Sequence, residues 1–265
     1  MLIIPLVVLL PLGTLLVSGC SANESIEGYP KGNTTTTGTL VRWNYAALGD
    51  SLAAGTEAPY KGYVDRYAEY IEADTGARVN VTNLGKNGQT SSELLYALRN
   101  DPSSRQTVEE AEIVTINIGI NDLGHAAQAY ENASCGGADN QDCLRTAAET
   151  LKGNWNAITA ELLRLRSTSD TIIRAAGLGY TPYLDTEAVP NSRPSNSELN
   201  DFQTFKTYLD EVNSHIAITA SNNDVPYTEV HLDKGYISPD GVHPNDEGYE
   251  VIAERLRELG YSPLR

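Results

Sequence analysis

From Trp43 onward, the hydrophobic and polar positions switch repeatedly between two periods. Five short runs of strand-like composition predict β-strands, at residues 45–48, 78–83, 113–118, 171–173 and 225–230. Apolar residues at helical spacing predict helices within residues 64–71, 144–165, 205–216 and 249–256, and a further helix is predicted to start near Thr90. Strands that alternate with helices in this way predict an α/β fold, a parallel sheet covered by helices on both faces.

The run from Ile113 to Ile118 is rich in β-branched residues on both faces, which predicts a strand at the centre of that sheet. In open parallel sheets, ligands bind in the crevice outside the carboxyl ends of the strands. Residues that directly follow the predicted strands are therefore the candidates for chemistry.

The chain begins with an almost unbroken apolar run from Leu2 to Val17, followed by Ser18-Gly19-Cys20. The run is shorter than the roughly 20 residues that a membrane-spanning helix needs. Its end resembles the lipobox of a bacterial lipoprotein signal peptide, which implies cleavage before Cys20 and lipidation of that cysteine. No Lys or Arg precedes the run, although signal peptides normally begin with a positively charged region. An ordinary secretory signal and a buried apolar segment are the alternatives.

The stretch from Ser21 to Thr39 is rich in Ser, Thr, Asn and Gly and has no apolar periodicity, which is typical of a flexible tether. The predicted organisation is a signal peptide at residues 1–19, a tether at residues 20–42 and one domain at residues 43–265. This layout predicts an exported cell-envelope protein, lipid-anchored to a bacterial membrane or otherwise secreted.

Composition excludes several classes of protein. With 40% hydrophobic residues the 265-residue chain can bury a core, which excludes a fully disordered protein. It carries 19 Lys and Arg against 35 Asp and Glu, a formal net charge of −16, so it lacks the basic surface of a general nucleic-acid binder. The same charge is repelled by anionic lipid headgroups, so the only membrane contact expected is the lipid at Cys20. The three cysteines do not show the paired spacing of a zinc site.

Polar turns follow the first two predicted strands. The first strand is followed by Gly49-Asp50-Ser51, where the glycine permits a tight turn and Ser51 can present a nucleophilic hydroxyl. Gly-Asp-Ser is also a common turn composition, so the alternative is a simple loop. After the second strand, Gly85 and Gly88 precede a helix and leave backbone N–H groups free to face an anion. The alternative there is a loop that only needs glycine flexibility.

Two further turns carry candidate polar side chains. Asn121 follows the third strand and can donate its amide to a developing oxyanion, or it can simply cap a helix. After the fifth strand, Asp240 and His243 are separated by a glycine turn. The Asp240 carboxylate can accept the Nδ1 proton of His243, which leaves Nε2 free to take a proton from a serine. A capping Asp and a surface His are the alternative.

The four motifs, Gly-Asp-Ser-Leu, Asn-x4-Gly-x-Thr, Gly-x-Asn-Asp and Asp-x-x-His-Pro, occur in this order, and each follows a predicted strand. From Trp43 to the C-terminal helix, the chain resembles the SGNH subgroup of GDSL lipases and esterases. That resemblance implies a flavodoxin-like three-layer α/β/α fold with five parallel strands in the order 2-1-3-4-5. It also implies a serine hydrolase of carboxylic esters, of the lipase, esterase or lysophospholipase kind, which uses no metal or cofactor. We expect the protein to be a monomer.

The resemblance also assigns roles residue by residue. Ser51 is expected to be the nucleophile, His243 the general base and Asp240 the acid that orients it. The backbone N–H groups of Ser51 and Gly88 and the side-chain amide of Asn121 are expected to form the oxyanion hole. A carbohydrate O-acetyl esterase, with a shallow polar cleft and a tiny acyl pocket, is the alternative within the same chemistry. A non-catalytic binding module is the alternative outside it.

Several other residues are interpreted as structural rather than catalytic, or leave both possibilities open. In an exported protein, Cys135 and Cys143 predict a disulfide, whereas a metal site with Asp139 and Asp142 matches no known ligand spacing. His125, His215 and His231 are interpreted as surface or core residues, and of these only His125 lies near a predicted strand end. Tyr60, Tyr63, Tyr180 and Tyr183 are expected either to shape an acyl pocket or to pack ordinarily. The long loop at residues 177–197 has few structural signals and is a candidate lid.

Overall fold

The computed structural model describes residues 40–179 and 200–264. The predicted signal peptide, the site at Cys20 and residues 20–39 of the predicted tether lie outside the described residues, as do Tyr180, Tyr183 and most of the candidate lid. The first strand begins at Arg42, one residue inside the predicted tether. We describe only the domain that follows.

The centre of the domain is a five-stranded sheet. Its strands are β1 (Arg42–Gly49), β2 (Arg78–Asn83), β3 (Ile113–Asn117), β4 (Ile172–Ala176) and β5 (Tyr227–Thr228). They lie in the order β2-β1-β3-β4-β5, and every neighbouring pair is parallel. The predicted parallel sheet and its order are therefore confirmed.

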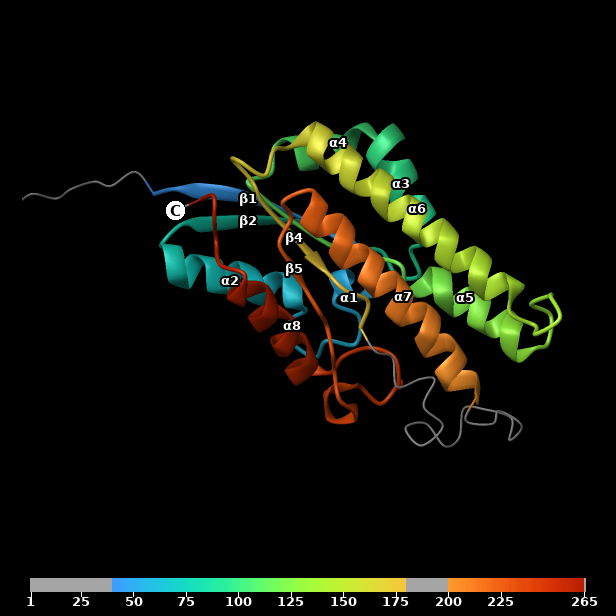
Figure 1. Ribbon diagram of the computed structural model, residues 1–265. Helices are drawn as coiled ribbons and strands as arrows, with labels where there is room; N and C mark the ends of the chain where they lie inside the picture. The colour runs from blue at the N-terminus through green and yellow to red at the C-terminus, as the bar shows by residue number, and fades with distance from the viewer. Residues whose placement is uncertain (1–39, 180–199, 265) are drawn as a thin grey trace, which may run out of the picture. The chain divides into compact units, whose positions relative to one another are not determined.

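Helices cover both faces of the sheet (Figure 1). One face carries α2 (Tyr63–Thr75) and α8 (Asp246–Glu258). The other carries α3 (Ser91–Asn100), α4 (Pro102–Glu109), α5 (Ile120–Glu131), α6 (Asp142–Leu165) and α7 (Asn200–Asn222). The alternation of side chains along β1 explains the two cores, because Tyr45 and Ala47 pack with α2 and α8 while Ala46 and Leu48 pack on the opposite side. Among the helices that the structure describes, none is both long and apolar enough to span a bilayer.

Helix α4 and helix α5 were not predicted from the hydrophobic pattern, nor was the short α1 (Ser51–Ala54). Helix α4 is mostly polar and has no clear apolar periodicity. Its start is marked by a cap, in which the Asp101 carboxylate accepts hydrogen bonds from the N–H groups of Ser103 and Ser104. Pro102 follows that cap at the first helical position, where its missing N–H costs nothing. The signal for α4 is thus a capping signal rather than a periodic one.

The fifth strand is shorter than the predicted run at residues 225–230. Only Tyr227 and Thr228 pair with β4. The N–H of Val225 donates instead to Ala220 O at the end of α7, and Pro226 has no N–H to donate. Val225 and Val230 are buried all the same, so the apolar pattern reports core packing here rather than strand pairing.

Candidate active site

Ser51 lies at the tight turn between β1 and α1. Gly49 ends the strand with φ of +153°, and a Cβ there would come within 2.2 Å of Asn117 O on the adjacent β3. Only glycine fits both the conformation and the space. Asp50 caps α1 by accepting the Leu52 N–H at 3.0 Å, and Ser51 is the first residue of that helix, 7% exposed.

The Asp50 side chain itself is buried completely. Burial raises its pKa to about 7, against the opposing effect of the hydrogen bond from Leu52 N–H, and the nearby charge of Asp122 raises it further. Its second carboxylate oxygen has no hydrogen-bond partner in the described structure. A carboxyl group of this kind is easily protonated and lies directly beside the serine.

Gly88 lies in the loop between β2 and α3. Hydrogen bonds from Leu84 N–H to Ala47 O and from Lys86 N–H to Gly49 O, 2.8 and 3.1 Å long, hold this loop against the end of β1. Gly88 has φ of +74°, a left-handed backbone conformation that residues other than glycine rarely adopt. The loop therefore lies beside the serine turn and exposes Gly88.

Asn121 lies in the first turn of α5, which begins directly after β3. Its Nδ2 donates to Gln89 O at 3.0 Å, next to Gly88. The following residue, Asp122, accepts hydrogen bonds from the N–H and the hydroxyl of Ser91, at 2.9 and 2.5 Å. Two adjacent residues of α5 thus bind the loop and helix that follow β2.

Asp240 and His243 meet across the turn that precedes α8. His243 Nδ1 lies 2.5 Å from Asp240 Oδ2. The other oxygen of Asp240 accepts the Ser238 hydroxyl at 2.5 Å and the N–H groups of Val242 and His243 at 2.9 and 3.0 Å. Partial burial alone would raise the pKa of Asp240, but the hydrogen bonds from Ser238 and His243 outweigh it and bring the pKa to about 2. The carboxylate is therefore ionised and fixed against the imidazole.

The structure brings four of the predicted residues, Ser51, Gly88, Asn121 and His243, to the wall of one cavity of about 400 Å³. Asp240 lies behind His243, whose side chain is 18% exposed. Within the described residues, the Ser51 hydroxyl forms no hydrogen bond with His243, although both residues line the cavity. Its apolar wall, which the sequence pattern did not identify, consists of Leu52, Ile120, Ala127, Phe205 and Val242.

The remaining candidates divide between the cavity and the rest of the molecule. His125 lines the cavity one helical turn after Asn121, as its place near a strand end suggested. His215 contacts Asn156 on α6, at 3.0 Å, and lies outside the cavity. Tyr60 is exposed, whereas Tyr63 is buried in the core against α8 and is not part of the cavity wall.

A disulfide joins Cys135, in the loop between α5 and α6, to Cys143 in the first turn of α6, as predicted. Asp139 and Asp142 both pair with Arg145, at 2.8 and 2.9 Å, rather than facing a common centre. Among the described residues, no group of three or more His, Cys, Asp or Glu side chains is placed to hold a metal ion.

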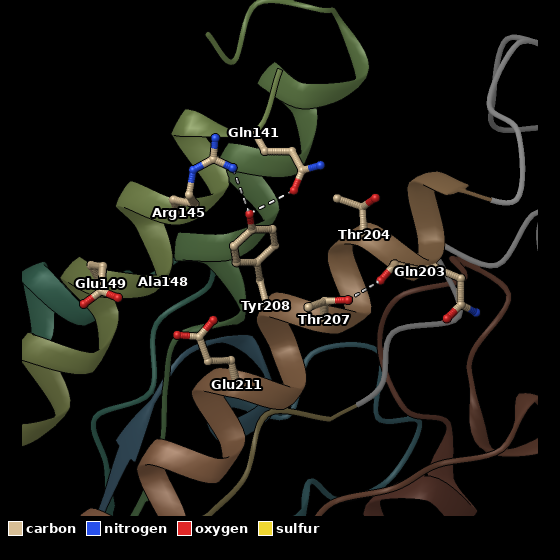
Figure 2. Close-up of a pocket in the computed structure, with 9 residues that line it drawn as sticks. All are labelled: Gln141, Arg145, Ala148, Glu149, Gln203, Thr204, Thr207, Tyr208 and Glu211. Atoms are coloured by element: carbon tan, nitrogen blue, oxygen red, sulfur yellow. Dashed lines mark hydrogen bonds between the residues drawn. The ribbon is translucent and has the colours of Figure 1, made fainter. Parts of the chain in front are cut away.

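A larger groove of about 650 Å³ lies between α6 and α7 (Figure 2). Figure 2 shows Tyr208 at its centre, whose hydroxyl donates to Gln141 at 2.9 Å and accepts from Arg145 at 3.5 Å. Glu149 and Glu211 on its rim share Lys152, at 2.7 and 2.5 Å. The charged groups of this groove already have partners, and the groove lies on the helices rather than at the strand ends. The smaller cavity at Ser51 is therefore the candidate active site.

Comparisons with known proteins identify the family of the chain. A family model described as GDSL-like lipase/acylhydrolase matches residues 47–251. The spore germination lipase LipC of Bacillus licheniformis is 28% identical, in an alignment that covers 83% of this chain and 97% of that protein. The lipase Lip_vut3, from a goat rumen metagenome, superposes with a TM-score of 0.69 and 25% identity and covers 84% of this chain and 100% of its own.

A variant of Axe2, an acetyl xylan esterase from Geobacillus stearothermophilus, has a TM-score of 0.58 and 17% identity, with 85% of this chain and 99% of that chain covered. At that identity it shares the fold. The family match is more informative, because it spans more than half of the chain and includes Ser51, Gly88, Asn121, Asp240 and His243. The chain belongs to the GDSL-like lipase/acylhydrolase family and is a carboxylic-ester hydrolase.

Proposed function

We propose that the chain cleaves its ester through a covalent acyl-enzyme on Ser51, with His243 as general base and Asp240 as its orienting acid. The observation that carries the proposal is that Ser51 and His243 line one cavity while Asp240 binds the far side of the imidazole. With Nδ1–H donated to Asp240, Nε2 is the nitrogen that can accept the Ser51 proton. The serine oxygen then bonds to the ester carbonyl carbon, and the alkoxide leaves with the proton that His243 returns. Water hydrolyses the acyl-enzyme by the same steps.

The oxyanion that forms in each step needs hydrogen-bond donors. The backbone N–H of Ser51, the backbone N–H of Gly88 and the Asn121 amide belong to residues on one wall of the cavity. One hydrogen of the Asn121 amide is bound by Gln89 O, which fixes the side chain and leaves the second for the oxyanion. Loss of a single donor of this kind costs roughly 10²–10³ in turnover.

The cavity favours an acyl group with an aliphatic chain. Its volume of about 400 Å³ falls within the ~300–1,000 Å³ of ordinary small-molecule sites. Leu52, Ile120 and Phe205 form part of its wall, so a multi-carbon acyl chain gains by leaving water there. We therefore favour an esterase or lipase of the multi-carbon kind, including a lysophospholipase, over an O-acetyl esterase.

A series of p-nitrophenyl esters from acetate to palmitate tests this preference. We expect kcat/KM to rise beyond acetate and to reach its maximum at a multi-carbon chain, and the Ser51→Ala variant to be inactive on every ester. A steady fall from acetate onward would instead support the O-acetyl esterase. A fluorophosphonate probe that failed to label wild-type Ser51 would leave only the non-catalytic binding module.

We also propose that the enzyme acts at the cell envelope as a monomer anchored by lipid at Cys20. The support is the lipobox-like sequence Val17-Ser18-Gly19-Cys20 ahead of a polar stretch. Labelled palmitate should be incorporated into the full chain expressed in a bacterium and not into the Cys20→Ser variant. Equal labelling of the two would contradict the anchor, and light scattering of the domain would test the monomer.

A further inference from the structure

A second groove, of about 570 Å³, opens along the exposed side of α3 next to the catalytic cavity. Asn87 and Gly88 belong to the walls of both. The rest of its wall consists of Lys86, Gln89, Ser92, Glu93, Tyr96, Ala97 and Asp101. A substrate attacked by Ser51 can therefore extend past Gly88 into this groove, which we call the α3 groove.

Tyr96 gives the α3 groove a flat apolar surface. Its side chain is 69% exposed on the outward face of α3, where it contributes nothing to the core. An exposed aromatic ring of this kind packs well against the C–H face of a saturated ring. Asn87 and Ser92 in the same wall carry side-chain groups that can bind hydroxyls.

The charges of the α3 groove do not favour an anion. Lys86 forms no ion pair with the residues that the structure describes, but the charge of its ammonium group acts on both Glu93 and Asp101. Glu93 accepts the N–H and hydroxyl of Thr90, and Asp101 accepts the hydroxyl of Ser104, so both carboxylates have lowered pKa values. The capping box of Thr90 and Glu93 also occupies the helix start that would otherwise attract a negative group. One positive and two negative charges suit a neutral ligand that carries many hydroxyls.

We propose that the α3 groove binds the alcohol half of the ester, and that this alcohol is an uncharged carbohydrate whose ring stacks on Tyr96. The inference rests on the proposed function of Ser51, because it extends the same bound substrate. Besides its carbonyl oxygen, the ester carbonyl carbon carries two substituents, the acyl chain and the alkoxy group of the alcohol. The apolar cavity suits the chain, and the polar groove with its aromatic surface suits the sugar.

Three esters with the same acyl group test the proposal: an octanoyl ester of glucose, ethyl octanoate and octanoylglycerol phosphate. The wild type should cleave the glucose ester with the highest kcat/KM. In Tyr96→Ala, the ratio of kcat/KM for the glucose ester to that for ethyl octanoate should fall about fivefold, mainly through KM, since stacking of this kind is worth on the order of 1 kcal/mol. Tyr96→Phe keeps the ring and should keep most of the ratio. Tyr60→Ala, at an exposed tyrosine outside both walls, is the matched control and should leave the ratio unchanged.

Three results would overturn the inference. An equal loss on both esters in Tyr96→Ala would show that the ring only supports the structure of α3. A preference for the phosphate ester that disappears in Lys86→Ala would make the groove an anion site. Failure of the wild type to cleave any of the three would refute the proposed function itself, whereas cleavage of ethyl octanoate without preference for the sugar would refute the sugar site alone.

Discussion

At the scale of single residues, four hydrogen bonds fix the Asp240 carboxylate of the proposed triad. Because the pKa of Asp240 is about 2, its charge persists through the neutral range and keeps the imidazole of His243 oriented there. In Asp240→Asn, the new amide faces Nδ1 as a donor and forces the imidazole proton onto Nε2. We expect kcat to fall by about 10⁴ with the melting temperature nearly unchanged, as p-nitrophenyl ester hydrolysis and thermal unfolding would measure.

The chain offers a matched control for that substitution. Asp233 lies 3.8 Å from His231, and both side chains are exposed and outside the cavity wall. Asp233→Asn should keep its activity. An Asp240→Asn enzyme as active as Asp233→Asn would remove Asp240 from the mechanism.

The buried carboxyl group of Asp50 should make the free energy of unfolding depend on pH. Its pKa is raised to about 7 in the folded protein, whereas in the unfolded chain the group should titrate near its ordinary value of about 4. Between these values the folded protein holds a proton that the unfolded chain has released, so the free energy of unfolding falls as pH rises through this window. Asp50→Asn keeps an oxygen for the Leu52 N–H and removes the titration. It should therefore gain stability relative to the wild type, on the order of a few kcal/mol, as pH rises from about 4 to about 7.

Urea unfolding across that window would measure the effect. The exposed Asp224, replaced by Asn as a control, should give a difference from the wild type that stays flat with pH. A flat difference for Asp50→Asn as well would contradict the buried, easily protonated carboxyl.

At the scale of elements, Asp122 joins the two segments that carry Gly88 and Asn121. Its carboxylate binds the N–H and hydroxyl of Ser91 at the start of α3, and Asn154 from α6 donates to the same hydroxyl at 2.8 Å. Asp122→Ala should let the two oxyanion donors drift apart. We expect kcat to fall by roughly 10–100-fold with little change in KM, since small misplacements of catalytic groups carry costs of this size.

Ser91→Ala tests the same link from the other side. If the link positions the donors, its effect and that of Asp122→Ala should be strongly non-additive in the double variant. A KM effect of equal size, or simple additivity, would mean that Asp122 only stabilises the fold.

Helices and strands that bury regularly spaced apolar side chains were predictable from the sequence. Elements held mainly by local hydrogen bonds were not. Strand β3 is buried over its whole length and helix α6 along one face, so the apolar pattern of each is clear in the sequence. Helix α5 buries small side chains such as Ala126 and Ala127, which give a weak periodic signal. The meeting of Ser51, Gly88, Asn121 and His243 at one cavity was predictable because parallel strands bring their carboxyl ends to one edge. The apolar wall was not, since Phe205 reaches it from a helix far along the chain.

At the scale of the whole molecule, the chemistry and a major structural anchor lie at opposite ends of the sheet. Arg174 on β4 is 1% exposed and donates to Gly260 O and Ser262 O, at 2.8 and 2.9 Å, so it holds the segment after α8. That segment also binds Asp74, in the last turn of α2 ahead of β2. The C-terminal segment is thus tied to the end of the sheet where the strands begin (Figure 1). The cavity lies at the other end, because Ser51, Gly88 and Asn121 in its wall follow β1, β2 and β3.

This separation predicts that stability can be lost without loss of chemistry. Arg174→Met fills the space but removes two partly buried hydrogen bonds from a charged donor, to Gly260 O and Ser262 O, so the free energy of unfolding should fall by about 2–4 kcal/mol. Below its melting temperature the variant should keep kcat within about twofold of the wild type, because the cavity wall does not include this region. Arg255→Met, which removes an exposed pair with Glu258, is the matched control and should change stability by about 0.5 kcal/mol or less. A large fall in kcat for Arg174→Met at low temperature would show instead that the two ends of the sheet are coupled, and that the C-terminal segment helps to hold the strand ends on which Ser51 and His243 depend.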